Sequence, residues 1–403
     1  PEALRGFTVG GSTTFGRPYD DAVSFSSWLR LLLDEVEPER RHEVINAGGI
    51  SYASYRIDVL LGEILAYEPD VLVVYTGHNE FLEERTWPEL RGGPGPLRRV
   101  QSWVSGLRTT TAMRQVLGHE EEGDDALAGR GLDDDVRARL DVQDGLEAYH
   151  RDGDLRERVV AEFRENLDRI VRRARARGVS VVLVKPASNL EDFPPFKSEP
   201  STDGSTQRRL EELLAEGRAR LEANPEEALE PLREAARLDP QHAAARFLLG
   251  RAELALGRPE AARLELEAAR EEDVCPLRAL AAITSAVDEV GAESQVPVID
   301  LPALLEKESH AGGGHGLLGD EHFLDHVHPT VEVHQRVALE LVRVFREIGV
   351  VAGRGPSPER RAALFGSHLG GLDPAYFARR DVNLGKVLGW AGKVEESRRA
   401  LER

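Results

Sequence analysis

Short apolar runs alternate with amphipathic stretches through the first third of the chain. Residues 7–9 and 70–75 predict strands, and the second run is continuously apolar, as in strands buried on both faces of a parallel sheet. Between them, residues 25–36 and 55–67 place apolar side chains at helical spacing. The chain therefore begins with strands and helices in alternation.

Three further strands extend this pattern. They are predicted at residues 44–45, 179–184 and 296–301, and helical sequence precedes the last two. Five strands separated by helices predict an α/β fold, a flavodoxin-like, doubly wound, five-stranded parallel sheet. We expect its first part in residues 1–200 and its last part in residues 273–350.

Residues 83–150 interrupt the α/β pattern. They hold a run of glycine and proline at 92–96 and a dense acidic patch at 120–144. This composition predicts a surface excursion with partial disorder, and a functional lid is the alternative.

An all-α helical repeat is predicted at residues 207–272, inserted in the α/β domain. Three pairs of equivalent residues stand 34 positions apart: Pro225 and Pro259, Leu232 and Leu266, and Ala235 and Ala269. This period, with small residues at such positions, resembles the tetratricopeptide repeat, which implies a module that binds a protein partner. An ordinary helical hairpin is the alternative. A partial third unit is predicted near Ala378, within the C-terminal tail at 351–403.

Charge and composition narrow the function classes. The 403 residues include 52 Lys and Arg against 71 Asp and Glu, a net charge of −19, which argues against a nucleic-acid-binding surface. No apolar run approaches the roughly 20 residues of a membrane span. Cys275 is the only cysteine, so intrachain disulfides and multi-cysteine metal sites are excluded. Only five of the 52 basic residues are lysines, a bias that favours a bacterial source.

Candidate chemistry gathers where strands are predicted to end. Ser12 directly follows the first strand, at the edge of a parallel sheet where ligands collect. Asn79 follows the strand at 70–75 and brings an amide donor to the same edge. Asp325 and His328 stand three residues apart, before a helix predicted from Pro329 or Thr330 onward, and form a candidate base–orienter pair.

Taken together and in this order, these residues resemble the SGNH (GDSL-like) hydrolase family, in which four sequence blocks supply Ser, Gly, Asn and His. The resemblance covers roughly residues 1–82, 155–200 and 290–350. It implies an ester hydrolase with a catalytic triad: Ser12 as the nucleophile and His328 as the base. Asp325 would orient that base.

The resemblance also implies an oxyanion hole. Its donors would be the Ser12 backbone N–H, the Asn79 side chain and an N–H of the second block, from Ser51 or Gly49. That block reads Asn-Ala-Gly-Gly-Ile-Ser, with serine where the family usually has glycine. The first block reads Gly-Gly-Ser-Thr in place of Gly-Asp-Ser. His78, Glu80 and Asn189 are predicted as a possible substrate rim, and Glu80 stands where the family often has aspartate.

Two other kinds of site are disfavoured. Four histidines lie close in sequence: His315, His322, His326 and His328. Zinc sites usually need three convergent ligands, and the three glycines at 312–314 give no rigid frame, so we expect no metal and no cofactor. The α/β-hydrolase elbow requires glycine two positions after the nucleophile, where this chain has Thr14.

The sequence thus predicts a metal-independent serine esterase or deacylase that works through an acyl-enzyme. A small acyl ester, a lipid or an acylated glycan all fit as substrate. Two alternatives remain: an O-acyltransferase that uses the same triad on a glycan or polymer, and a non-catalytic repeat scaffold. Localisation is undetermined. Proteins similar to this one often carry an N-terminal anchor, which favours the bacterial cell envelope over the cytoplasm.

Overall fold

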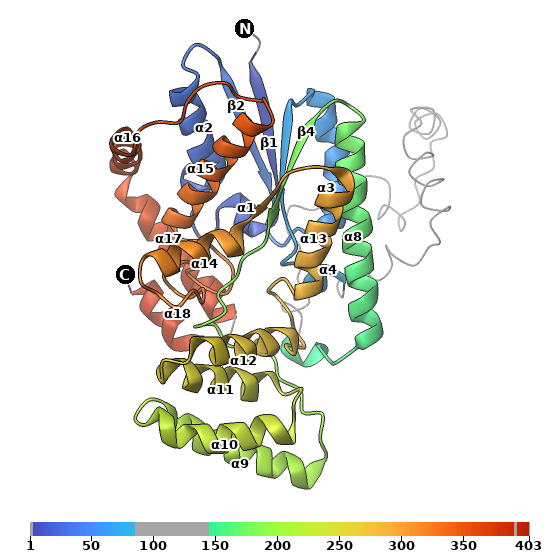
Figure 1. Ribbon diagram of the computed structural model, residues 1–403, viewed down its shortest axis with the longest axis vertical. Helices are drawn as coiled ribbons and strands as arrows, with labels where there is room; N and C mark the ends of the chain where they lie inside the picture. Colours follow the sequence, from blue (N-terminus) through green and yellow to red (C-terminus); the bar gives the residue numbers. More distant parts are fainter. Residues whose placement is uncertain (1–2, 85–144, 391–392, 403) are drawn as a thin grey trace, which may run out of the picture.

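A five-stranded sheet forms the centre of the computed structural model, which describes residues 3–84, 145–390 and 393–402. All strands are parallel, in the order β2-β1-β3-β4-β5 (Figure 1). They are β1 (Leu4–Gly10), β2 (His42–Gly48), β3 (Val71–Tyr75), β4 (Ser180–Lys185) and β5 (Val298–Asp300). This order confirms the predicted flavodoxin-like, doubly wound fold.

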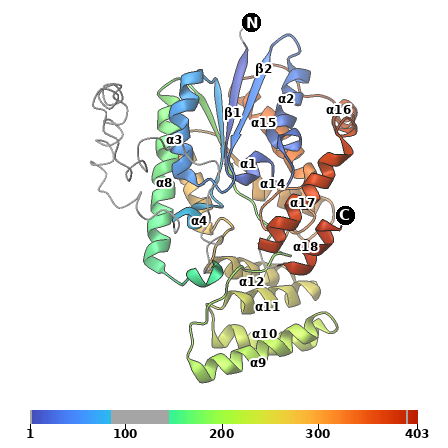
Figure 2. The same ribbon diagram turned by 180° about the vertical axis from the view of Figure 1, so that it is seen from behind.

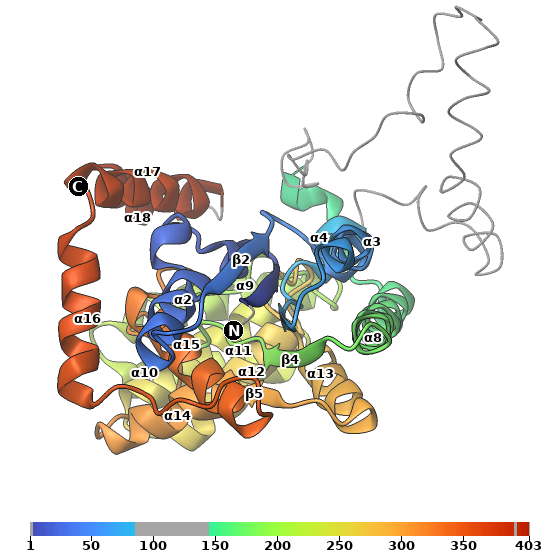
Figure 3. The same ribbon diagram turned by 90° about the horizontal axis from the view of Figure 1, so that it is seen from above.

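Alternate residues of the central strands pack on opposite faces of the sheet. In β3, Val71, Val73 and Tyr75 belong to one core, and Leu72 and Val74 belong to the other. Burial on both faces explains why this strand is apolar throughout. Helices cover each face (Figure 3): α2 (Phe25–Val36), α14 (Leu301–Ala311) and α15 (Val331–Glu347) on one, and α3 (Ser54–Ile64), α8 (Gly153–Arg175) and α13 (Ala281–Ser294) on the other.

The chain turns sharply at the carboxyl end of β1. A side chain at Gly10 would overlap the carbonyl oxygen of Tyr75 and the hydroxyl of Thr14, so only glycine lets the next helix start beside the strand ends. Thr14 Oγ1 donates to that Tyr75 oxygen at 3.0 Å. Ser12 is therefore held at the carboxyl edge of the sheet. The short elements of the domain are α1 (Ser12–Phe15), η1 (Asp21–Val23), η2 (Leu65–Tyr67), α4 (Glu80–Glu84) and η4 (Gly145–Ala148).

The predicted helical repeats lie between β4 and β5 in the chain and form a layer beyond one end of the sheet (Figure 1). They are α9 (Gly204–Leu221), α10 (Pro225–Leu238), α11 (Ala243–Ala255) and α12 (Pro259–Glu271). Each helix pair has a close contact through glycine: Gly217 meets Leu232, and Gly250 meets Leu266. These contacts bring the paired helices together and explain why small residues recur.

Three helices follow α15: α16 (Pro358–Gly370), α17 (Pro374–Trp390) and α18 (Val394–Leu401). The last two form a hairpin (Figure 2). Gly385 of α17 meets Leu401 of α18, as Gly250 meets Leu266 in the repeats. Leu384 and Leu388 pack with Phe193, on the loop after β4. The hairpin is therefore attached to the α/β domain.

Most of the predicted excursion at 83–150, from residue 85 to residue 144, lies outside the described residues. Within the described ranges, every helix is too short or too polar to cross a lipid bilayer.

Two leucines on α12 test the packing of the repeats. Leu266 is buried against Gly250, whereas Leu264 is 70% exposed. We expect Leu266→Ala to lower the free energy of unfolding by about 2–5 kcal/mol, because it opens a cavity where α12 packs against Leu190 and Leu317 of the α/β domain. Leu264→Ala, on the same helix, should change it by less than about 0.5 kcal/mol. Urea unfolding followed by circular dichroism makes the comparison, and equal losses would contradict this packing.

Candidate active site

Ser12, His328 and Asp325 form one hydrogen-bonded chain. His328 Nε2 lies 2.8 Å from Ser12 Oγ, and His328 Nδ1 lies 2.6 Å from Asp325 Oδ2. Asp325 and His328 are buried, and Ser12 is partly exposed. The fold thus brings together three residues predicted from the sequence, two of them more than 300 positions from the first.

The carboxylate of Asp325 is compensated on both oxygens. Its Oδ1 accepts the backbone N–H groups of Val327 and His328, each at 2.9 Å, while Oδ2 faces the His328 ring. Burial alone would raise the pKa of Asp325, but the adjacent His328 and His326 and these hydrogen bonds hold it well below its usual range. Asp325 is therefore ionised, and it can hold a proton on His328 Nδ1.

A tight loop sets the spacing between Asp325 and His328. Phe323 and Pro329 form an antiparallel bridge, and Leu324 N–H donates to the His328 carbonyl at 2.9 Å. The following helix, α15, begins only at Val331. The helix therefore starts one residue after the predicted Thr330, which is its N-cap. Pro329 belongs to the bridge rather than to the first turn of the helix, and His328 lies in the loop.

The oxyanion candidates lie around the same edge. Asn79 Nδ2 is close to Gly11, where a side chain would clash with it, and it donates to the Tyr52 carbonyl at 3.2 Å. Gly49 N–H donates to the Gly10 carbonyl at 3.0 Å, so it is engaged in the backbone. Ser51 has a left-handed backbone, with φ of 61°, and lines the cavity at Ser12.

The three residues predicted as a substrate rim are buried, which corrects that prediction. His78 Nδ1 accepts the Ala279 N–H at 3.1 Å. Asn189 caps its own loop: its Nδ2 donates to Asp320 and its Oδ1 accepts the Asp192 N–H. Residues next to a strand end alternate between the cavity and the interior, and these side chains point inward.

Glu80 is also buried, and it holds the second and third blocks together. It accepts from the Ser54 N–H at 2.9 Å and from the Ser54 hydroxyl at 2.8 Å. Asn166 of α8 donates to the same hydroxyl at 3.0 Å. Since Ser54 follows Ser51 and Glu80 follows Asn79, this network fixes the two predicted oxyanion segments relative to each other.

A cavity of about 360 Å³ opens at Ser12 and His328. Its lining comes from six segments of the chain: Ser12, Arg17, Ile50, Ser51, Asn79, Leu82, Leu277, His326, Val327, His328, Asn383, Lys386 and Val387. The last three belong to α17. Sequence reasoning missed them, because their only signal is a helical spacing that fits a repeat surface equally well.

Helix α17 is fixed to the segment that follows Ser12. Asn383 Nδ2 donates to the Pro18 carbonyl at 3.0 Å. The Tyr376 hydroxyl donates to the Asp20 carbonyl at 2.9 Å and accepts the Asp20 N–H at 3.0 Å. Helix α17 is therefore one wall of the cavity.

Asp325, His326 and His328 are the one group of possible metal ligands among the described residues, with ligand atoms within 4.8 Å of one another. Both ring nitrogens of His328 are already engaged, with Asp325 and Ser12. Burial lowers the pKa of His326 to about 3, and its ring contacts Phe193 and Phe196. The arrangement fits a proton-transfer chain better than a metal site.

Comparisons with known proteins identify the repeats. Residues 213–283 match the family model of the tetratricopeptide repeat, which confirms the predicted repeat type. No curated protein matches the chain.

Solved structures similar to the chain include an acetylxylan esterase from Geobacillus stearothermophilus. It is 12% identical, with a TM-score of 0.37, and the match covers 85% of this chain and 94% of that one. Another is an alpha/beta hydrolase enzyme from the metagenome of Lake Arreo, Spain, at 11% identity and a TM-score of 0.38, covering 85% and 96%.

Three buried histidines near the site make stability depend on pH. Burial lowers the pKa values of His78, His326 and His334 to about 3 each. The unfolded chain binds their protons near pH 6.5 and the folded chain does not, so stability is full above about pH 6.5 and falls with acidification.

His334 offers the cleanest test, because it lies in the core against Phe25. We expect the wild type to lose about 2 kcal/mol more than His334→Phe between pH 7.5 and pH 5.0, measured as free energy of unfolding in urea. His310→Phe, at an exposed position, is the control. Parallel losses in wild type and His334→Phe would show that His334 takes up its proton in the folded state.

Proposed function

We propose that this chain is a metal-independent serine hydrolase of the SGNH type that cleaves a carboxylic ester through an acyl-enzyme on Ser12. The observation that carries the proposal is the hydrogen-bonded chain from Asp325 through His328 to Ser12. A serine hydroxyl is a weak nucleophile unless an adjacent base accepts its proton, and this geometry provides that base.

In the first half-reaction, Ser12 Oγ attacks the ester carbonyl carbon while its proton moves to His328 Nε2. The resulting imidazolium is stabilised by Asp325, whose Oδ2 faces Nδ1. As the tetrahedral intermediate collapses, the bond to the leaving alcohol breaks and the alcohol takes the proton from Nε2. The acyl group is then bonded to Ser12 Oγ.

In the second half-reaction, water replaces the alcohol. His328 Nε2 removes a proton from the water as the water attacks the acyl carbon, and it returns that proton to Ser12 Oγ as the acid leaves.

The same acyl-enzyme would form in an acyltransferase, with an alcohol in place of water. The cavity at Ser12 is open to water, and we therefore propose hydrolysis.

The negative charge on the carbonyl oxygen needs preorganised donors. We propose the backbone N–H groups of Ser12 and Ser51 and the side-chain amide of Asn79. Ser12 starts α1, and the first N–H groups of a helix have no partner within it. Gly49 is the weaker second-block candidate, because its N–H already donates to Gly10.

We also propose that the repeats bind a protein partner. The match to the tetratricopeptide family supports this role, because stacked helical repeats present extended surfaces to other proteins. The exposed Leu264 of α12 adds apolar surface on the repeat layer.

Labelling of the serine tests the proposal directly. A fluorophosphonate probe should modify the intact protein at the Ser12 peptide, because only an activated hydroxyl reacts. Ser12→Ala should abolish labelling, and His328→Ala should slow it at least about 10³-fold. Ser367→Ala, on the exposed surface of α16, is the matched control. A folded wild-type protein that takes up no probe would contradict the proposal.

The proposed oxyanion donors give a second test. Asn79→Ala should lower kcat about 10²–10³-fold on an activated acetate ester, with a smaller change in KM, because the lost donor acts mainly in the transition state. Ser51→Gly should keep most of the activity, since it retains the N–H and suits the left-handed backbone. A strong loss of kcat in Ser51→Gly, with little loss in Asn79→Ala, would show that the Ser51 hydroxyl and not the Asn79 amide is the side-chain donor.

A further inference from the structure

The cavity at Ser12 has an unusual charge. Among the described residues that line it, two are cations, Arg17 and Lys386, and none is an aspartate or glutamate. The chain as a whole carries 71 acidic residues against 52 basic ones. A cavity that reverses the sign of the whole protein attracts anions locally.

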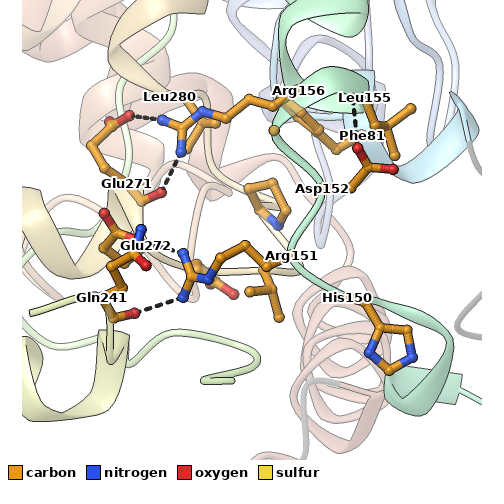
Figure 4. A pocket seen from close by; sticks show the side chains of 14 residues that line it. Phe81, His150, Arg151, Asp152, Leu155, Arg156, Gln241, Glu271, Glu272 and Leu280 are labelled. Carbon is orange, nitrogen blue, oxygen red and sulfur yellow. Dashed lines mark hydrogen bonds and ion pairs between the residues drawn. The ribbon is translucent and has the colours of Figure 1, made fainter. Parts of the chain in front are cut away.

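Several cations in other cavities are already neutralised by neighbours. In the cavity at the start of α8, Arg151 pairs with Glu272 at 2.5 Å and Arg156 with Glu271 at 2.6 Å (Figure 4). In another, Lys185 lies 2.5 Å from Asp300. Such cations are held by the protein itself and are not free to bind a ligand.

Arg17 and Lys386 differ from these. Within the described part of the chain, neither has a carboxylate within ion-pair distance. The Arg17 guanidinium lies over the Phe15 ring, 5.5 Å from its centre, a contact that leaves its N–H groups available. Lys386 is exposed on the cavity side of α17.

Hydrogen bonds fix the position of the backbone near both cations. Arg17 N–H donates to the Ser12 carbonyl at 3.0 Å, which ties Arg17 to the turn after the nucleophile. Lys386 lies one helical turn after Asn383, whose side chain holds the Pro18 carbonyl. The two cations therefore reach the cavity from two separate walls, the segment after α1 and the helix α17.

We propose that this cavity accepts esters that carry a negative charge near the scissile bond, in preference to neutral esters. This inference rests on the proposed hydrolase function and narrows its substrate class. The Arg17 guanidinium can bind a carboxylate, sulfate or phosphate through two parallel hydrogen bonds, and Lys386 adds a point charge. Arg17 is half-buried, which strengthens its interaction with an anion relative to bulk water.

Two matched pairs of esters test the preference. In the first, 4-acetoxybenzoate is compared with its methyl ester, so that only the leaving group changes charge. In the second, the 4-nitrophenyl half ester of adipic acid is compared with 4-nitrophenyl hexanoate, so that only the acyl group does. For each pair, kcat/KM is divided by the rate of uncatalysed hydrolysis, and the ratio of anionic to neutral ester is taken.

We expect the wild type to favour the anionic ester in at least one pair. Arg17→Gln combined with Lys386→Gln should lower that ratio about tenfold or more, the lower range for hydrogen bonds to charged groups. Higher NaCl should lower the wild-type ratio in the same direction. Arg354→Gln, which removes an exposed cation between α15 and α16, should leave the ratio unchanged. A ratio that the double variant does not change would overturn the inference.

A binding measurement separates this inference from the proposed function. Calorimetry on Ser12→Ala compares the same ester pairs without acylation. If no ester is turned over but the anionic ester binds more tightly and loses that advantage in the double variant, the cation site stands and the hydrolase proposal fails. If esters are hydrolysed without charge preference, and bind without it, the hydrolase proposal stands and the cation site fails.

Discussion

The buried carboxylate of Asp325 is the interaction on which the candidate site depends. An ionised carboxylate without partners would be too costly in the interior, where burial strongly disfavours charge. Here two backbone N–H groups and the His328 ring compensate it, all within one loop of four residues. The loop can adopt this shape because the bridge between Phe323 and Pro329 closes it. The charge and the loop therefore stabilise each other, and both orient His328 toward Ser12.

A second buried carboxylate serves the opposite side of the site. Glu80 joins the start of α3 to the start of α4, and Asn166 adds α8 through the Ser54 hydroxyl. Such a network costs free energy if any member is left unpaired, so it specifies one arrangement of the elements it joins. An aspartate at this position would be one methylene shorter. Glu80 reaches Ser54 and so takes a positioning role.

The sequence predicted which residues meet at Ser12 better than it predicted the walls of the cavity around them. Ser12 and Asn79 could be placed because parallel strands end at one edge, and the spacing of Asp325 and His328 set their pairing. The inward direction of His78, Glu80 and Asn189 could not be predicted, because one residue of offset at a strand end moves a side chain from the cavity to the interior. Gly49 was predicted as a donor, but its N–H is engaged with Gly10, a contact between the end of β1 and the residue after β2 that residue pattern alone does not show.

The contribution of α17 to the cavity wall could not be predicted from the sequence for a different reason. Its contacts with the segment after Ser12 join residues more than 350 positions apart, as between Asn383 and Pro18. The helix packs on α18 as a repeat pair would, through Gly385 and Leu401, and it also turns one face to the cavity. Helix α17 is thus attached both to the segment after Ser12 and, through Leu384 and Leu388, to Phe193 on the loop after β4. Because Lys386 and Val387 line the cavity, the position of α17 relative to the segment after Ser12 sets the shape of that wall.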